Sequence, residues 1–485
     1  MNGPRPATRY RLAGWVWLAG LACGIGTGAA RAAPGVPPVH GAGAAAAYDN
    51  IPRDLPAPVT IGECIVDDSR VQPTAALPQI GNLGTVYVIE LGRWGIHADG
   101  THPQETTSGL NAAIAWASQQ GYGTVHLPAG LYRVGQVVNS LYVGGVILPG
   151  HLHFELAAGA TIQMMTTDHP HYCVVDIPDG TDVKISGGTV LGDRPTHVYA
   201  GGGTHEFGMA ICVGSAGGSD RILIESMTLA DAIGDGVIIN DAPGVSRNVT
   251  IRNNNIHHHR RQGVSIIGGV DIVIENNQIH HIAGTDPQFG VDIEATLGDN
   301  QNRNILIRGN AFYQNQGGDY VNTGGRNVWL VQNTLDQTGL SERQGDGPII
   351  FWHKTDQVIR GNTITTTVGS SNGQWALVSY PLGANPLAPT LIEDNIFHGG
   401  GINVGGGTHE SRMTYVRIAG NVVHDHNFVV EGVPCTQFDN NEVIDDGQVS
   451  WPYIFHGVYG RAAGNRRDGA PMDLPLSPDV PYDHP

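Results

Sequence analysis

One phrase recurs eight times between Val249 and Val443: an apolar strand-like run, an asparagine, one further residue and a large apolar residue. Its copies include VTIRNNNI, IVIENNQI and ILIRGNAF. The shared asparagines, 20 to 33 residues apart, are Asn254, Asn277, Asn310, Asn333, Asn362, Asn395, Asn421 and Asn441. A single unit of this kind cannot bury its own apolar face, so it must stack on copies of itself. The repeat therefore predicts a solenoid.

Two roles are open for the repeated asparagine. It tolerates the left-handed backbone region at a turn, and its side-chain amide can bond to the asparagines of neighbouring coils to form a ladder. Alternatively, these residues are ordinary turn residues scattered along the stack. Leucine-rich repeats are excluded because their leucine consensus is missing and β-branched residues dominate. Coils of this length with short strands predict an all-β fold, a right-handed parallel β-helix.

Composition fits one long solenoid domain, which grows in one dimension and escapes the usual size limit of a domain. Only 14% of the residues are charged and 69 of 485 are glycine, which suits many short strands joined by tight turns. The formal charge is −18, and it becomes −22 without the first 32 residues, which hold four arginines and no acid. Such an acidic chain disfavours nucleic acid, membrane surfaces and, weakly, long polyanionic glycans as partners. We expect a monomer without a cofactor.

The ends of the chain differ from its middle. Residues 1–32 combine arginines with an apolar stretch and end in Ala-Arg-Ala, which predicts a cleavable signal peptide and hence a secreted or periplasmic protein. Residues 33–82 are rich in Pro, Ala and Gly and predict a poorly ordered or extended leader. The β-helix domain is expected over residues 83–465. Residues 466–485 are rich in proline and predict a tail.

A capping helix is expected before the first coils. Thr107 or Ser108 can cap it, and Gly121 and Gly123 end it. Its apolar face would hold Leu110, Ala113, Ile114 and Ala117. A helix at the open end of a β-helix protects an otherwise exposed sheet edge. The expected fold is thus a right-handed parallel β-helix with an N-terminal capping helix.

The run ADG...TTSGLNAAIAWASQQGYGTVHLPAGLYRV resembles the start of the pectate-lyase-like β-helix proteins. The branch it resembles is shared by rhamnogalacturonase-type enzymes, mannuronan epimerases and phage appendage or tailspike depolymerases. The resemblance covers roughly residues 86–465. Members of this group bind or break polysaccharides, so the resemblance implies a polysaccharide or oligosaccharide as partner.

Polar residues gather on three strands that align when the coils are stacked, DGVIIND (235–241), QGVSIIG (262–268) and FGVDIEA (289–295). Side chains alternate along a strand, and neighbouring coils lie about 4.8 Å apart. The outward columns then contain Ile238, Ser265 and Asp292 in one, Asn240, Ile267 and Glu294 in the next, and Asp235 and Gln262 at the strand entrance. This face is a candidate substrate groove.

Asp292 and Glu294 are the strongest catalytic candidates. Two residues apart on one strand, their Cα atoms lie roughly 6.5 Å apart. Sugar cleavage needs one carboxyl group as an acid and another as a base or nucleophile, and closeness should raise the pKa of one of them. A solvated polar face is the competing interpretation of such a pair. Asp235 as a third acid, with Arg260 and Arg261 to bind substrate beside Gln262 and Asn240, favours catalysis.

The segment GDRPTHVYAGGGTHEFG, residues 192–208, interrupts the coil rhythm with a step of 39 residues and is long enough to fold out over the groove. Ordered loops often carry function, and this one supplies a proton donor, a base and a cation. We expect His205 and Glu206 to act in catalysis and Asp193, Arg194 and Tyr199 to bind substrate. A plain surface loop is the alternative.

In mannuronan epimerases an acid-His-Glu segment, an Asp on the following coil and an Arg-His on the next form the site. The chain resembles that order through His205-Glu206, Asn240 after Asp235, and Arg261-Gln262. Asn240 stands where an acid is expected and Gln262 where a histidine is expected. The G-D-D and G-H-G motifs of galacturonan hydrolases are matched only in part, since their second Asp and their His are absent.

Cysteines and histidines leave further options open. Cys64, Cys173, Cys212 and Cys435 remain after the signal peptide and permit disulfides in an oxidising compartment, although burial of Cys173 and Cys212 in apolar strands is favoured. His257, His258 and His259 stack near His280 and His281 and could chelate a transition metal. Polar bulk is ordinary at such a turn, so no metal site is expected.

These observations predict a secreted polysaccharide-active β-helix, a glycoside hydrolase that uses paired carboxylates on adjacent coils. A polysaccharide lyase or uronate C5-epimerase is the first alternative, with His205 or Arg261 as the base. A glycan-binding or adhesion solenoid without catalysis is the second.

Overall fold

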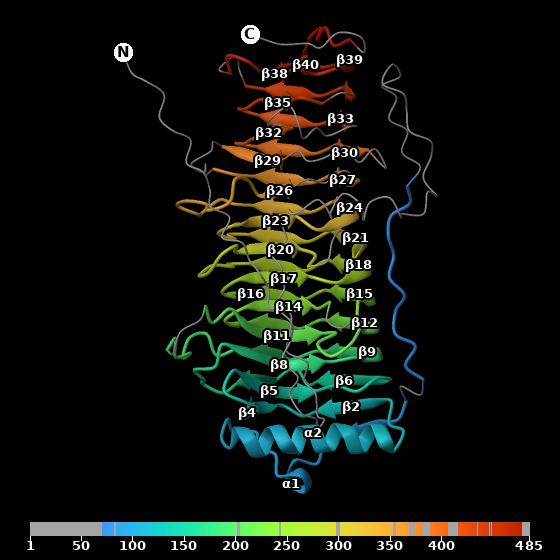
Figure 1. Cartoon of the computed structure of the whole chain (residues 1–485), viewed down its shortest axis with the longest axis vertical. Helices are drawn as coiled ribbons and strands as arrows, with labels where there is room; N and C mark the ends of the chain where they lie inside the picture. Colours follow the sequence, from blue (N-terminus) through green and yellow to red (C-terminus); the bar gives the residue numbers. More distant parts are fainter. Residues whose placement is uncertain are drawn as a thin grey trace, which may run out of the picture.

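The chain folds as a parallel β-helix of three long sheets that run the length of the molecule (Figure 1). The structure is a computed structural model that describes residues 70–81, 84–200, 204–241, 244–296, 301–352, 356–367, 374–380, 389–405, 416–433, 435–445, 447 and 449–477. Within these residues, sheet A has 14 strands from β1 (Val86–Val88) to β39 (Gly460–Ala463), and sheet B has 14 from β3 (Gly130–Val134) to β41 (Ala470–Pro471). Sheet C has 13 strands, from β4 (Gln136–Val137) to β38 (Tyr453–His456).

Each coil contributes one strand to sheet A, then one to sheet B and one to sheet C. The coil with β15 (Ser246–Arg252), β16 (Asn255–His257) and β17 (Gln262–Ile266) is representative. The coil before it contains β12 (Asp220–Glu225), β13 (Thr228–Ala230) and β14 (Asp235–Ile239). The coil after it contains β18 (Gly269–Glu275), β19 (Gln278–His280) and β20 (Phe289–Ile293). Valine, isoleucine and leucine from all three sheets fill one continuous core.

The repeated asparagines form a ladder at the turn between sheets A and B. The Nδ2 of each donates to the Oδ1 of the next, at 3.0 Å from Asn254 to Asn277 and 3.0 Å from Asn277 to Asn310. The same Nδ2 also binds a backbone carbonyl of the preceding coil, and each Oδ1 accepts a backbone N–H as well. The ladder is therefore confirmed, and it has a ninth member, Asn465.

The left-handed backbone position lies one residue before each ladder asparagine, so its assignment to the ladder asparagines themselves was wrong. Asn253, Asn276, Gln332 and Gly361 have φ of 55°, 55°, 55° and 65°. The turn needs a residue that tolerates positive φ, followed by an amide that points into the stack. The sequence fills these two needs at adjacent positions.

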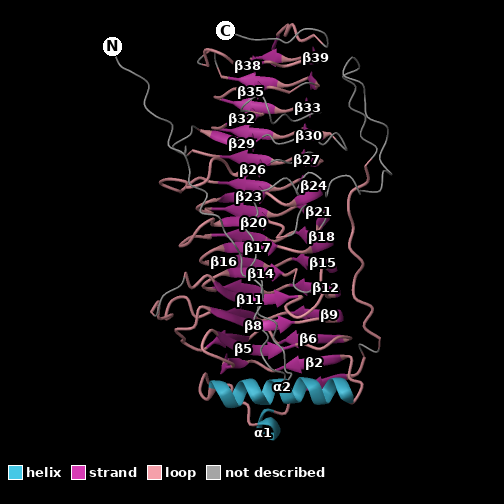
Figure 2. Cartoon of the chain, viewed as in Figure 1, coloured by secondary structure: helices cyan, strands magenta, loops and turns pink. Residues whose placement is uncertain are grey.

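A helix covers the first coil, as Figure 2 shows. α2 (Pro103–Gln119) packs Leu110, Ala113, Ile114 and Ala117 against the core, which confirms the predicted apolar face. It begins at Pro103, earlier than either predicted cap. Thr107 lies within it and its hydroxyl donates to the Pro103 carbonyl at 2.6 Å and accepts from the Gly135 N–H at 2.8 Å. A second, short helix, α1 (Leu91–Trp94), precedes it.

Both ends of the described chain run against the solenoid. The predicted signal peptide lies outside the described residues, as does most of the leader. Residues 70–81, the described end of the leader, run extended along the outside of sheet A (Figure 1), where the Gln79 N–H binds Asp182 at 2.8 Å and Arg70 pairs with Asp356. In the expected tail, β40 (Arg466–Arg467) and β41 (Ala470–Pro471) extend sheet B. No helix in the described ranges is long and apolar enough to cross a membrane.

One buried acid in the core should make stability depend on pH. Burial raises the pKa of Asp319, on β23 (Gly318–Asn322), to about 7, although the side chains of Asn315 and Gln337 donate to it at 2.9 and 2.6 Å. The folded state therefore keeps a proton that the unfolded chain releases near pH 3.8. The contribution of Asp319 to stability should be most favourable below that pH, fall as pH rises to about 7, and then level off.

Asp319→Asn tests this effect because it keeps the shape and removes the charge. We expect the variant to gain about 2 to 3 kcal/mol relative to the parent between pH 5 and pH 8, measured by urea unfolding at both values. An unchanged difference between variant and parent at the two pH values would contradict this assignment.

Candidate active site

The outward columns on sheet C are present, but the alternation of side chains is broken at the start of each strand. The register pairs Ile238 with Ser265 and Ser265 with Asp292, as the stacked strands predict. Strict alternation would turn Asp235 toward the core with Val237. Gly236 prevents this, because a Cβ there would point at the core side chain of Ile256, 2.7 Å away.

The same glycine recurs in the next two coils. A Cβ on Gly263 would lie 2.5 Å from the Ile279 side chain, and one on Gly290 would lie 2.7 Å from Phe312. Each strand therefore places two successive residues on the core side. The residue before the glycine points to the outer side of the sheet. Asp235 and Gln262 therefore lie on the same side of sheet C as Asp292.

Asp235 and Asp292 are each held by a side chain from the coil between them. The Arg261 Nη1 lies 3.1 Å from Asp235 Oδ2, and the Ser265 hydroxyl donates to the same oxygen at 2.8 Å. Gln262 donates through Nε2 to Asp292 Oδ2 at 2.7 Å. The Arg261 Nη2 lies 4.0 Å from Glu294 Oε2. The predicted carboxylates thus form one cluster around Arg261, which we call the carboxylate cluster: Asp235, Arg261, Gln262, Ser265, Asp292 and Glu294.

The acids of the carboxylate cluster differ in burial and in proton affinity. Asp235 and Asp292 are 0% and 4% exposed, whereas the Glu294 side chain is 34% exposed. Burial raises the pKa of Asp235 to about 6, with the Arg261 charge opposing the shift. Burial and then the neighbouring Glu294 raise the pKa of Asp292 well above its ordinary value. Burial also raises the pKa of Glu294, and Arg261 opposes that shift. Asp292 is therefore the acid best suited to hold a proton near neutral pH.

Glu206 adds a further acid next to the cluster. It immediately precedes β11 (Phe207–Val213), the sheet C strand that pairs with β14, and its charge acts on both Asp235 and Arg261. The Oε2 of Glu206 and the Oδ1 of Asp235 are buried and accept no hydrogen bond within the described residues. These two acceptors are thus enclosed beside the carboxylate cluster without a partner among the described residues.

His205 lies in a closed network inside the 192–208 segment. Its Nδ1 lies 2.9 Å from His197 Nε2, its Nε2 lies 3.0 Å from the Ala200 carbonyl, and His197 Nδ1 lies 2.9 Å from Asp193 Oδ2. Both ring nitrogens of His197 and of His205 are thus engaged within the segment. The predicted catalytic role of His205 would require this network to open.

Arg260, Arg194 and Tyr199 fasten the same segment to the solenoid. The Arg260 Nη1 donates to the Thr204 and His205 carbonyls at 3.0 and 2.9 Å, and its guanidinium stacks 4.9 Å from the centre of the Tyr199 ring. Arg194 donates to the His258 carbonyl at 2.5 Å. These contacts place the segment at the corner between sheets B and C, beside the carboxylate cluster. The predicted contacts of these three residues with substrate stay predictions.

Asn240 stays apart from the carboxylate cluster. It is half-buried, and its closest side-chain partner is the Val213 carbonyl at 3.5 Å. Ile267 lies between it and Glu294 in their column. A role for Asn240 at the substrate also stays a prediction.

Sequence reasoning missed two parts of the site. Ser265 was placed in the right column without a role, although it binds Asp235. An outward apolar cluster of Phe289, Val321 and Ile350, with Trp352 packed on it, continues the columns beyond Asp292. The register of the apolar strands could have located it, because Val321 pairs directly with Asp292.

Two of the cysteines form a disulfide that was not expected. Cys173, on β8 (His171–Ile177), and Cys212 form a disulfide with Cα atoms 5.9 Å apart, so the preference for two unpaired buried cysteines was wrong. Both are nevertheless buried. The two cysteines lie on neighbouring strands of sheet C, where Cys173 pairs with Met209 and Cys212 with Asp176, and the spacing alone could not reveal the bond between them.

The histidine cluster consists of stacked rings. His257 stacks on His280 with ring centres 5.0 Å apart, and His258 stacks on His281 at 4.8 Å. Among the described residues, three potential metal-ligand atoms converge only at Cys173, Asp176 and Cys212, where the disulfide occupies both sulfurs.

Residues 179–364 match the family described as a right handed beta helix region. Together with the three stacked sheets, this defines the chain as a right-handed parallel β-helix protein. Two solved structures share the fold. The A-module of the mannuronan C-5 epimerase AlgE6 from Azotobacter vinelandii aligns with a TM-score of 0.56 and 17% identity over 80% of this chain and 100% of that chain. The tailspike protein gp49 of Acinetobacter baumannii bacteriophage Fri1 aligns with a TM-score of 0.51 and 12% identity over 82% of this chain and 65% of that one.

Two curated proteins of Bacillus subtilis (strain 168) are similar in sequence. The uncharacterized protein YclG is 27% identical over 300 residues, which are 57% of this chain and 49% of that protein. The SPbeta prophage-derived uncharacterized protein YorA is 28% identical over 309 residues, 59% of this chain and 50% of that protein. The chain spans about half the length of these curated relatives.

Proposed function

We propose that the protein is a polysaccharide-active enzyme, a glycoside hydrolase whose reaction is carried out by Asp292 and Glu294. The observation that carries the proposal is the unequal environment of these two acids, which lie two residues apart on one outward strand. Burial keeps a proton on Asp292, while Arg261 favours the charged form of the more exposed Glu294. A glycosidase needs one protonated and one ionised carboxyl group at the same bond.

In this mechanism Asp292 donates its proton to the glycosidic oxygen as the bond from that oxygen to the anomeric carbon breaks. Glu294 acts as the base for the attacking water or as the nucleophile at the anomeric carbon. Asp235 and Glu206 lie beside these two acids, and their charges act on Arg261. Arg261 holds Asp235 in place and limits the charge of the cluster.

The fold relationship supports a carbohydrate substrate. AlgE6 is a mannuronan epimerase, and gp49 is described as a capsular polysaccharide depolymerase. Hydrolysis is favoured over epimerisation or β-elimination because Gln262 occupies the position where the epimerase resemblance needs a histidine. Its amide is fully engaged, since Nε2 donates to Asp292 and Oε1 accepts from the Phe289 N–H at 2.7 Å. An amide in this position cannot remove a proton from a sugar carbon.

We also propose that the protein is exported. The arginines and apolar stretch of residues 1–32 have the pattern of a signal peptide. The disulfide between Cys173 and Cys212 supports this, because such bonds persist in oxidising compartments. Fractionation of cells that produce the full-length chain tests the proposal, and retention of the protein in a reducing cytoplasm would contradict it.

Digestion of a panel of neutral and acidic polysaccharides tests the reaction type. We expect new reducing ends without absorbance from an unsaturated product, measured by a reducing-sugar assay, ultraviolet spectroscopy and mass spectrometry. Products with ultraviolet absorbance would instead indicate a lyase. Binding to a glycan without any product, from a protein with intact circular dichroism, would indicate a glycan-binding solenoid.

A further inference from the structure

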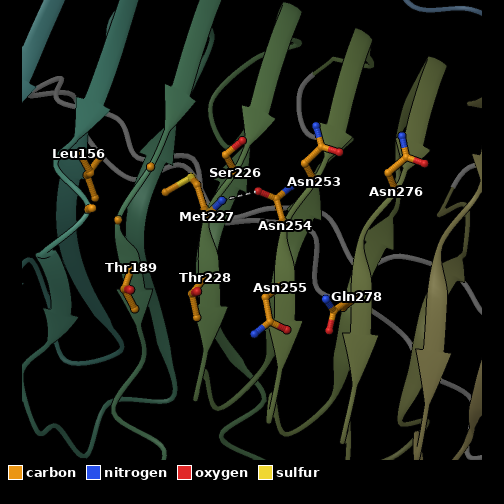
Figure 3. A pocket seen from close by; sticks show the side chains of 13 residues that line it. Leu156, Thr189, Ser226, Met227, Thr228, Asn253, Asn254, Asn255, Asn276 and Gln278 are labelled. Carbon is orange, nitrogen blue, oxygen red and sulfur yellow. Dashed lines mark hydrogen bonds between the residues drawn. The ribbon is translucent and has the colours of Figure 1, made fainter.

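A second groove runs along the corner where sheet A turns into sheet B. No strand of sheet C lines it. Its volume is about 780 Å³, and it extends from Leu156 at one end to Gln278 at the other. Figure 3 shows its side chains in two rows along successive coils, with Met227 and Asn254 between the rows. The groove crosses the same coils as the carboxylate cluster but opens at a different corner.

The rows arise from the residues on either side of the asparagine ladder. Ser226, Asn253 and Asn276 precede the ladder position, and their φ angles of 57°, 55° and 55° turn their side chains out of the stack (Figure 3). The second row follows the ladder position and pairs in register across β10 (Thr189–Leu191), β13, β16 and β19. It consists of Thr189, Thr228, Asn255 and Gln278.

The hydrogen-bonding groups of the groove are largely free. The side-chain amides of Asn253 and Asn276 are exposed and bind no other group within the described part of the chain. Asn255 accepts from His280 Nε2 at 2.8 Å, which leaves its amide nitrogen available. Free amides that both donate and accept match sugar hydroxyls, which do the same.

The groove carries no charge and has definite ends. All of its lining residues are neutral, although the chain as a whole has a formal charge of −18. In the coil that holds Thr189, Gly187 and Gly188 leave the first row and the ladder position without side chains, and beyond Gln278 the second row is interrupted at Ala311. The continuous polar stretch therefore covers these coils and is interrupted at Gly309 and Ala311, before Gln332 and Thr334.

We propose that this groove is a second glycan-binding site, which takes an extended neutral polysaccharide lying along the axis of the solenoid. Coils about 4.8 Å apart present an amide or hydroxyl at each step, so successive sugar units can meet equivalent groups. The site holds the polymer without bringing it to the carboxylate cluster. It would therefore tether the protein to its substrate independently of any cleavage.

Affinity electrophoresis of the full-length chain in gels containing dextran, laminarin, galactomannan or alginate tests the proposal. The triple variant Asn253→Gly, Asn276→Gly, Gln278→Ala removes three amides, and glycine keeps the positive φ at the first two positions. We expect at least one neutral polysaccharide to retard the parent and its affinity for the triple variant to fall about tenfold or more. Asp292→Asn should be retarded like the parent.

A matched control lies on the same turn, outside the groove. Gln332→Gly with Thr334→Ala removes the equivalent side chains two coils further along and should leave the retardation unchanged. The proposal is overturned if no neutral polysaccharide retards the parent, or if parent and triple variant are retarded equally. Retardation that disappears in Asp292→Asn would place the binding at the carboxylate cluster instead and would also overturn it.

Discussion

Asp292→Asn is expected to lower the turnover of a cleavable polysaccharide by at least about 100-fold, the usual contribution of a positioned general acid. The amide keeps the size of the side chain and its contact with Gln262, but it cannot deliver a proton to the leaving oxygen. Initial rates from the reducing-sugar assay, at saturating substrate, measure the loss. The Michaelis constant should change little, because a catalytic proton is needed in the transition state and not for binding.

Glu294→Gln should cause a loss of similar size, and its pH profile should distinguish the two acids. In the parent, activity should fall at low pH as Glu294 takes up a proton and at high pH as Asp292 loses one. Burial raises the pKa of both acids, so the optimum is displaced upward from the range of ordinary carboxyl groups. An optimum below the ordinary carboxyl range would contradict the assignment.

Asp271→Asn provides the matched control. Asp271 lies on β18 in sheet A, and its φ of 59° is one that asparagine also tolerates. This variant makes the same chemical change away from the carboxylate cluster and should keep the parental rate. Parental rates from both Asp292→Asn and Glu294→Gln, with an intact fold, would remove the two acids from the mechanism.

The fold could be predicted from the sequence because its signal repeats. In the eight copies the asparagine stands two residues before a core residue, so eight copies of one weak pattern reinforce each other. Asn465 escaped notice because its strand, in GRAAGNRR, lacks the large apolar residues of the other copies. The columns of Ser265, Asp292 and Glu294 followed from alternation once the coils were aligned.

The rest of the site depends on three-dimensional contacts that a sequence does not encode locally. Asp235 was expected in an outward column, but the reason for its outward turn, the extra core-facing position at Gly236, does not follow from strict alternation. His205 has the residue type of a catalytic base, but Ala200 and His197 occupy both of its nitrogens. The disulfide depends on the stacking of β8 on β11, across 39 residues of sequence. In each case the residue type indicated which chemistry was possible, and the residues in contact with it in the folded chain determined its role.

Asn333→Ala, in the middle of the ladder, is expected to lower the free energy of unfolding by about 3 kcal/mol, because several buried polar groups lose a partner together. The Asn333 Nδ2 donates to the Ile307 carbonyl at 3.0 Å, and its Oδ1 accepts the Asn310 backbone N–H at 2.9 Å and the Asn310 amide at 3.0 Å. The site is 2% exposed, so water cannot easily replace these bonds. The adjacent Gln332, exposed with a φ of 55°, supplies the control: Gln332→Gly should cost less than about 0.5 kcal/mol. Urea unfolding followed by circular dichroism compares the two, and equal midpoints would mean that the ladder adds nothing to the stacking of the apolar strands.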